Sequence, residues 1–258
     1  MPANRGPEED GRLGRAAAPA EAEAIDHYLC TGDADPLGFP WPGNVIERCV
    51  LADRDLRAAL IREVRRRENG RTRSGDPAVD VVALTRGKVE PMVRGLFPRA
   101  EQDTVLDVLE RSVVMVTSES IERVVVETSF LHSAWTLANL YLRSIGSEPL
   151  GDDEGAIVGL SIETTCFVTP AALEDEDPFE DLIVHEAAHV FHNCKRETPG
   201  LHSTRRREWL LEIDFRERET FAYACEAFSR IHARARTPAE RRRLAAEYAA
   251  EQMRAGNV

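Results

Sequence analysis

Residues 182–192 read Leu-Ile-Val-His-Glu-Ala-Ala-His-Val-Phe-His, with two histidines four positions apart and a glutamate directly after the first. On an α-helix, residues four apart lie on one face, one turn from each other. His185 and His189 can therefore bind one zinc ion, and Glu186 can reach a water molecule on that ion. The stretch predicts a helix that carries a zinc site, with Glu186 as the general base.

The residues around this stretch support the prediction. Asp177, Pro178 and Glu180 form a helix-start pattern: an N-cap, a proline at the first helical position, and a glutamate three residues after the cap. Residues 182–184 and 190–191 are apolar, so we expect a largely buried helix. A buried helix rarely carries three histidines and a glutamate unless they are paired or bind a metal. We therefore expect one zinc ion per chain, the alternative being a capped structural helix with hydrogen-bonded histidines.

Charge excludes some classes of partner. The 258 residues include 45 acidic and 33 basic side chains, which give a formal net charge of −12. Such a charge argues against a general nucleic-acid binder and against adsorption to an anionic membrane. One basic segment, residues 62–67 followed by Arg71 and Arg73, is interpreted as a solvated helix face rather than a phosphate-binding patch.

The cysteines indicate the cellular compartment. Cys30, Cys49, Cys166, Cys194 and Cys225 are odd in number, and no two of them form a C-x-x-C pair. This pattern favours reduced thiols over a disulfide framework. The first 25 residues lack the apolar core of a secretory signal, and no apolar run is long enough to span a bilayer. We expect a cytoplasmic protein without a nucleic-acid or membrane partner; the sequence does not define its oligomeric state.

Three regions are expected along the chain. Residues 1–24 are rich in proline, glycine, alanine and charge, which is typical of a disordered tail. Residues 25–95 are expected to form an N-terminal subdomain without an assigned role. It would begin with an irregular segment over residues 25–43 and contain a helix over residues 53–68. Residues 96–258 are expected to form the catalytic domain.

The second half of the chain shows the clearer periodicity and predicts an α+β fold, predominantly helical with a small mixed sheet. Thr237, Pro238 and Glu240 repeat the helix-start pattern before the last helix. The expected elements are a helix over residues 102–111, a buried strand over 112–117, a helix over 129–145, a β-rich stretch over 156–168, the zinc helix, a long helix over 203–236, and a final helix to about residue 255.

A catalytic zinc ion needs a third protein ligand and leaves its fourth position for water. Glu212, Glu219 and Glu226 lie seven residues apart and share one stripe of the long helix. Because neighbours in this stripe are about 10 Å apart along the axis, only one of them can reach the metal. Glu219 lies where the helix becomes apolar and needs a partner there. Glu226 is the other candidate, although a surface or orienting role is favoured for it.

At this point the chain resembles the gluzincin metallopeptidases. Residues 219–222, Glu-Thr-Phe-Ala, are similar to the Glu-x-Phe-Ala segment that supplies the third zinc ligand in the aminopeptidase branch of that clan. The resemblance implies His185, His189 and Glu219 as the ligands, Glu186 as the general base, and a zincin-like fold. It also implies that the β-rich stretch over residues 156–168 resembles the strand that pairs with an extended substrate.

These observations together predict a zinc metallopeptidase that acts on a peptide or protein. Tyr223 and His202 are weak candidates for a donor to the developing oxyanion, because a core position for Tyr223 and an exposed loop position for His202 are favoured. Two alternatives remain: an inactive zincin-fold protein with a regulatory or binding role, and a zinc amidohydrolase of non-peptide amides. Replacement of Glu186 by Gln separates the enzyme from the regulatory protein, because it abolishes hydrolysis and leaves the metal in place.

Overall fold

The computed structural model describes residues 18–71, 79–151, 158–173 and 181–255. These residues are mainly helical, with one small sheet, which confirms the predicted α+β class. The first elements are α1 (Pro19–Thr31), α2 (Val45–Glu68), α3 (Val81–Leu96), α4 (Arg99–Leu109), β1 (Val113–Met115), α5 (Ile121–Glu127) and α6 (Leu131–Ser144). They are followed by β2 (Gly159–Ile162), β3 (Thr165–Val168), η1 (Pro170–Leu173), α7 (Leu182–Asn193), η2 (Phe215–Glu217), α8 (Arg218–Arg234) and α9 (Pro238–Ala255).

The sheet has the strand order β1-β3-β2 and is mixed, as predicted. Strand β1 runs parallel to β3, with Val114 opposite Phe167, and β2 runs antiparallel to β3, with Leu160 opposite the same residue. The predicted β-rich stretch is thus a hairpin, and Glu163 at its turn adopts the left-handed conformation (φ 54°). Strand β2 is an edge strand: within the described ranges, no further strand pairs with its outer side.

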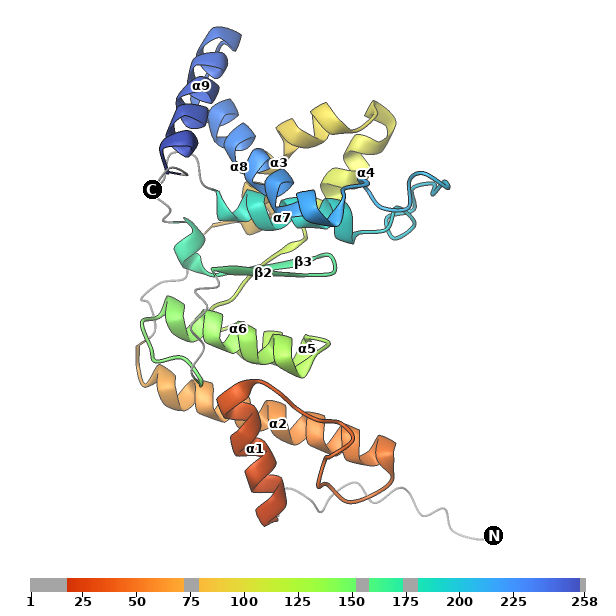
Figure 1. Cartoon of the computed structure of the whole chain (residues 1–258), viewed down its shortest axis with the longest axis vertical. Helices are drawn as coiled ribbons and strands as arrows, with labels where there is room; N and C mark the ends of the chain where they lie inside the picture. The colour runs from red at the N-terminus through yellow and green to blue at the C-terminus, as the bar shows by residue number, and fades with distance from the viewer. Residues whose placement is uncertain (1–17, 72–78, 152–157, 174–180, 256–258) are drawn as a thin grey trace, which may run out of the picture.

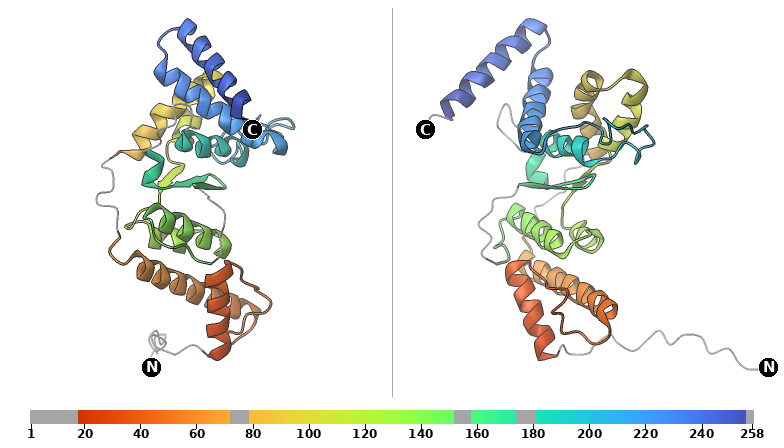
Figure 2. Two further views of the ribbon diagram at one scale, coloured as in Figure 1. Left: turned by 60° about the vertical axis from the view of Figure 1, so that its left-hand side comes forward. Right: turned by 45° about the vertical axis from the view of Figure 1, so that its right-hand side comes forward.

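Each face of the sheet borders a separate hydrophobic core. Cys166 and Val168 belong to the core formed with α3, α4, α7 and α8, whereas Phe167 belongs to the core formed with α1, α2, α5 and α6. Alternate residues of a strand point to opposite faces, which is why one short strand serves both cores. Figure 1 shows the resulting layers, with α1 and α2 at one end, then α5 and α6, the sheet, and α7 beneath α8 and α3. The two further views keep this order (Figure 2).

The two cores cut across the predicted subdomain boundary at residue 95. Helix α3 precedes this boundary yet packs with α7 and α8, and α5 and α6 follow it yet pack with α1 and α2. Helix α1 begins at Pro19, so the predicted tail of residues 1–24 extends too far; residues 1–17 lie outside the described part. Helix α1 also replaces much of the predicted irregular segment. Its buried Tyr28 donates a hydrogen bond to the carbonyl of Leu131 (2.7 Å), a tertiary contact that local sequence does not encode.

Helix α7 begins later than predicted. Its N-cap is Asp181, whose carboxylate accepts the backbone N–H of Val184 (3.3 Å), and not Asp177. Residues 177–180 lie outside the described part of the chain. Asp181 is buried and pairs with Lys88 of α3 at 2.7 Å, so a contact between distant helices selects the cap. Among the described residues, no helix combines the length and apolar character required for a membrane span.

The predicted long helix over residues 203–236 is wrong in its first part. Helix α8 begins at Arg218, directly after the short helix η2, and residues 203–214 form an irregular loop. The backbone N–H groups of Leu210 and Leu211 donate to the carbonyls of Cys194 (2.9 Å) and Phe191 (2.8 Å). These bonds join the loop to the end of α7 and use donors that a helix would need for itself. The final helix α9 is confirmed, with Thr237 and Glu240 forming its start.

Candidate metal centre

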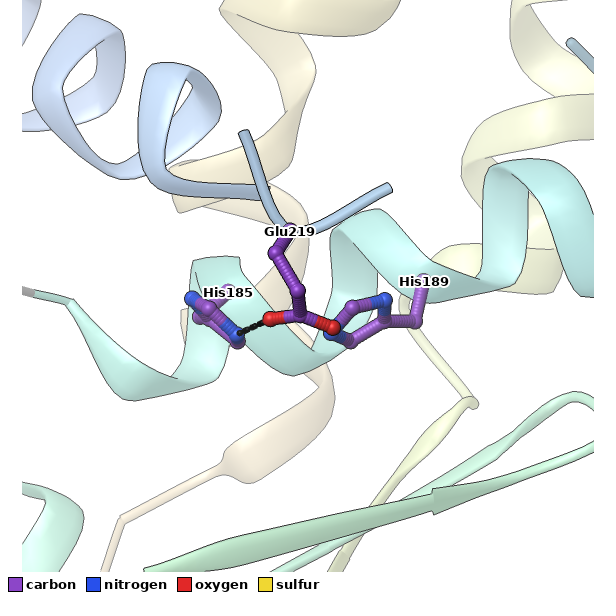
Figure 3. A group of neighbouring side chains, drawn as sticks. All are labelled: His185, His189 and Glu219. Atoms are coloured by element: carbon purple, nitrogen blue, oxygen red, sulfur yellow. Dashed lines mark ion pairs between the residues drawn. The ribbon is translucent and has the colours of Figure 1, made fainter. Parts of the chain in front are cut away.

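The three predicted ligands come together where α8 crosses α7. His185 and His189 lie one turn apart on α7, with ring centroids 5.0 Å apart. Glu219, in the first turn of α8, places its carboxylate between them (Figure 3). Its Oε2 is 3.4 Å from Nε2 of His185, and its Oε1 is 3.6 Å from Nε2 of His189. One ligand atom from each residue lies within 4.8 Å of the other two.

The two histidine–carboxylate distances, each to a different oxygen of Glu219, match the separation of neighbouring ligand atoms around one zinc ion. Tetrahedral zinc with bonds of about 2.0–2.2 Å to nitrogen and oxygen holds its ligand atoms roughly 3.3–3.6 Å apart. The side chains of His185 and His189 are only 12% and 13% exposed, whereas that of Glu219 is 67% exposed. A metal ion at this position would therefore be bound by the two histidines of α7 on its inner side, and its side next to Glu219 would face solvent. Such a site leaves room for water or for a substrate.

Carboxylates set the electrostatics around the histidines. Burial lowers the pKa of His189. Burial acts in the same direction on His185, but the carboxylates of Glu226, Glu186 and Glu219 outweigh it and raise the pKa of His185. Three carboxylates around two partly buried imidazoles create a negative potential that favours a cation.

Glu226 lies behind His185 rather than among the ligand atoms. It is buried in α8, two turns after Glu219, and its Oε2 is 3.5 Å from Nδ1 of His185. Its other oxygen accepts the backbone N–H of Asp181 (3.3 Å). Of the two glutamates that remained as candidates, Glu219 thus joins the ligand cluster. Glu226 holds the opposite nitrogen of His185, a contact that turns Nε2 of that ring towards Glu219.

A third histidine, His192, lies on the next turn of α7. Its side chain is buried, and its Nε2 is 3.3 Å from Nδ1 of His189. Burial, together with the charges of Arg218 and His189, lowers the pKa of His192 to about 4, so the ring is neutral near pH 7. From the sequence, an orienting or surface role is favoured for His192, because it lies seven residues and two turns after His185. The available signal was its position three residues after His189, which places it on the adjoining turn.

Glu186 is buried between α7 and the edge strand β2. The hydroxyl of Ser161 donates to its carboxylate and lies 3.2 Å from its backbone carbonyl, which also accepts the thiol of Cys166 (3.1 Å). A Cβ atom at Gly159 would lie 2.6 Å from Oε1 of Glu186, so the glycine gives this carboxylate its room. Burial raises the pKa of Glu186. Sequence analysis did not identify Gly159 or Ser161; a glycine inside a strand pattern was the one available signal.

The two weak candidates for an oxyanion donor lie in different surroundings. The ring of Tyr223 is 4.9 Å from that of His185, and its side chain is 54% exposed, so the core position expected for it was wrong. His202 is exposed, as expected, and its backbone carbonyl accepts a hydrogen bond from Nε of Arg196 (2.8 Å). It is not part of the cluster of His185, His189 and Glu219.

The described residues thus hold two partly buried imidazoles and an exposed carboxylate whose ligand atoms lie within 4.8 Å of one another, beside a buried carboxylate next to an edge strand. Searches of family models, curated proteins and solved structures find no match for this chain, so its chemistry is inferred from the residues of the site and their geometry.

Proposed function

We propose that this chain is a zinc-dependent peptidase with a gluzincin-like site, in which His185, His189 and Glu219 hold the metal ion and Glu186 is the general base. One observation carries the proposal: the ligand atoms of these three residues converge within 4.8 Å, and the residue next to the first histidine is a buried carboxylate. The crossing of a helix with two histidines by a helix with a glutamate, next to a small mixed sheet, supports the proposal of a zincin-like fold.

His185, His189 and Glu219 would hold the metal ion, which would supply a lowered pKa for a bound water molecule and polarisation of the scissile carbonyl. Glu186 accepts the proton of the attacking water, holds it, and delivers it to the leaving amine. Its raised pKa suits both steps, because a carboxyl group that is easily protonated keeps the proton until the amine departs. Ser161 and Gly159 fix the place of this carboxylate. The exposed hydroxyl of Tyr223 is the proposed donor to the oxyanion.

The edge strand supports a peptide substrate over a non-peptide amide. Strand β2 carries Gly159 and Ser161 against Glu186, and no described strand occupies its outer side. An extended peptide can add to such an edge through main-chain hydrogen bonds. A bound peptide would thereby lie along the strand that also holds the general base.

Two features argue against a purely regulatory metal site. Structural zinc sites are usually closed by four protein ligands, whereas the described cluster has three and an exposed side. The carboxylate of Glu186 is buried and accepts a side-chain hydrogen bond from Ser161, and burial of a charge with one neutral partner costs free energy that an apolar residue would not. Both features suit a catalytic site.

Metal content and peptide cleavage test the proposal together. Wild type is expected to bind one zinc ion per chain and to cleave members of a mixed peptide library. Glu219→Ala is expected to lose zinc, and Glu186→Gln is expected to keep zinc and lose cleavage. Glu197→Ala, at an exposed loop position, serves as the matched control and should change neither property. A wild-type chain that takes up no added zinc, or a Glu186→Gln variant that still cleaves, would contradict the proposal.

A further inference from the structure

His192 has a single polar contact in its buried position. It belongs to the same turn as Val190 and Phe191, which pack in the core, and its own exposed fraction is 4%. Its Nε2 is 3.3 Å from Nδ1 of His189, with the two rings nearly perpendicular. Its Nδ1 is buried and has no hydrogen-bond partner among the described residues. The contact with His189 is therefore what distinguishes this side chain from an apolar one of similar size.

A buried polar group without a partner destabilises the fold, because it has lost its hydrogen bonds to water. Phe or Leu at position 192 would avoid that cost and extend the apolar core around Phe191 and Val190. The histidine is thus unfavourable for the stability of the metal-free chain. Its contact with the free nitrogen of a proposed metal ligand offers a physical reason for its presence.

The proton positions of the two rings are linked. A neutral imidazole has one N–H donor and one acceptor nitrogen. If His192 donates through Nε2, His189 must carry its own proton on the Nε2 atom that faces Glu219, and this nitrogen then has no lone pair for a metal ion. If His189 donates from Nδ1 instead, its Nε2 is free to bind. The hydrogen bond between Nδ1 and Nε2 therefore decides whether His189 can be a ligand.

We infer that His192 is a positioning residue that accepts the Nδ1 proton of His189 and so keeps Nε2 of His189 in its metal-binding form. The inference rests on the proposed metal site and extends it. Each metal histidine then has its own partner on the side away from the metal: Glu226 for His185 and His192 for His189. Such partners fix the ring orientation and the tautomer of a ligand. When Nε2 of His192 accepts this proton, its own N–H lies at Nδ1, which is buried without a hydrogen-bond partner among the described residues.

Zinc affinity and metal-free stability separate this role from a structural one. His192→Phe is expected to raise the zinc Kd by about 10–100-fold in a competition titration with a zinc-chelating dye, because the loss of such a partner has effects of that size. In the metal-free protein, the same variant is expected to keep or raise the urea unfolding midpoint, because it removes an unpaired buried nitrogen.

A conservative variant and a spectroscopic measurement complete the test. His192→Gln places an amide oxygen near the position of Nε2 and should recover most of the zinc affinity. His27→Phe, at an exposed histidine of α1, is the matched control and should leave the Kd unchanged. Long-range ¹H–¹⁵N spectra of the zinc-loaded wild type should show His189 protonated at Nδ1 and His192 unprotonated at Nε2. These spectra decide the assignment even if His192→Phe fails to fold.

Three results would overturn the inference while leaving the peptidase proposal intact: an unchanged Kd in His192→Phe, a Gln variant as weak as the Phe variant, or a zinc-loaded His192 protonated at Nε2. A loss of metal-free stability that accounts for the weaker binding would likewise assign His192 a structural role. A wild type that binds no zinc would overturn both proposals. A wild type that binds zinc but cleaves no peptide would contradict only the peptidase.

Discussion

At the scale of single residues, the candidate site depends on small features of the strand opposite α7. Gly159 contributes no side chain, and this absence makes room for the carboxylate of Glu186. Ser161 then holds the carboxylate through its hydroxyl, and Cys166 holds the backbone carbonyl of the same residue. The position of the proposed general base is therefore set by the strand as much as by the helix that carries it.

Gly159→Ala is expected to lower the rate of peptide cleavage by at least about 10-fold. General base catalysis accelerates such reactions by about 10²–10⁴-fold, and a displaced base loses part of this acceleration. The added methyl group would lie 2.6 Å from Oε1 of Glu186 and force the carboxylate away. Zinc content should stay at the wild-type value, since none of the three proposed ligands moves. Steady-state kinetics and metal analysis on the same preparation check this.

Gly87→Ala is the matched control for that substitution. Gly87 lies inside α3, and a Cβ atom there meets nothing within 4 Å. Cleavage should be unchanged, and the free energy of unfolding should rise by about 0.5–1 kcal/mol, because alanine loses less conformational entropy in a helix than glycine. Equal losses of activity in both variants would show that the effect is not specific to the space around Glu186.

At the scale of elements, buried ion pairs and hydrogen bonds join helices that are far apart in the sequence. Lys88 of α3 contacts the carboxylate of Asp181, the N-cap of α7, at 2.7 Å. The backbone N–H of Asp181 in turn donates to Glu226 of α8. Three helices of one core thus meet at the start of the helix that carries His185 and His189, and these contacts fix α7 relative to α8.

Lys88→Met is expected to lower the free energy of unfolding by about 3 kcal/mol, because it leaves the buried carboxylate of Asp181 without its cation. The control is Arg94→Met on the same helix, whose pair with Glu90 is largely exposed. That change should cost no more than about 1 kcal/mol, as is usual for surface ion pairs. Urea denaturation of wild type and of both variants provides the comparison. Similar losses of unfolding free energy in the two variants would show that the Lys88–Asp181 pair stabilises the fold no more than a surface ion pair does.

An ion pair on α2, far from the candidate site, is expected to make the stability of the fold depend on pH. Hydrogen bonds from Arg66, opposed by partial burial and reinforced by Arg67, lower the pKa of Glu63 to about 2. A carboxyl group with a lowered folded-state pKa stabilises the fold above its ordinary pKa of 4.5, and this stabilisation is lost as the pH falls towards 2.

Glu63→Gln should therefore lower the free energy of unfolding at pH 7 by about 1 kcal/mol, an estimate reduced for solvent screening of a partly exposed pair. The difference from wild type should shrink between pH 4.5 and pH 2. Denaturation curves at pH 7, 4 and 2.5 measure it. A difference that stays constant over this range would show that the ionised carboxylate is not its source.

At the scale of the whole molecule, the three-stranded sheet joins two cores. Strand β3 contributes Phe167 to one core and Val168 to the other, so disturbance of either core reaches the same strand. The three proposed metal ligands belong to α7 and α8, on one side of the sheet. Zinc binding should nevertheless stabilise the whole chain if both cores unfold together.

Zinc at about 100 times its Kd is expected to raise the free energy of unfolding by about 2.7 kcal/mol in wild type. Thermal unfolding should show one transition that moves upward with zinc, and the shift should be absent in Glu219→Ala. Leu137→Ala, in the core away from the site, should lower the free energy of unfolding by about 2–5 kcal/mol and leave the zinc Kd unchanged. Two separate transitions, with only one sensitive to zinc, would show that the cores unfold independently.

Parts of the fold that depend on short-range spacing were predictable. The two histidines share one face of α7 because the helix repeats every 3.6 residues. The last helix begins at Pro238 because Thr237 and Glu240 satisfy each other's backbone donors. The β-rich stretch formed strands, and the fold class followed from the order of elements. The start of α8 was not predictable in the same way, because Leu210 and Leu211 bond to the end of α7.

The sequence by itself determined the helix with His185, Glu186 and His189 and restricted the proposed third ligand to a few glutamates. Only the tertiary structure shows that Glu219, and not Glu226, places its carboxylate between the two histidines, because that depends on where α8 crosses α7. The same holds for Gly159, which contacts Glu186 across 27 positions of sequence. Local periodicity fixes which residues share a face of one helix. It cannot fix which face of another element meets them, because that depends on the burial of side chains from the whole chain.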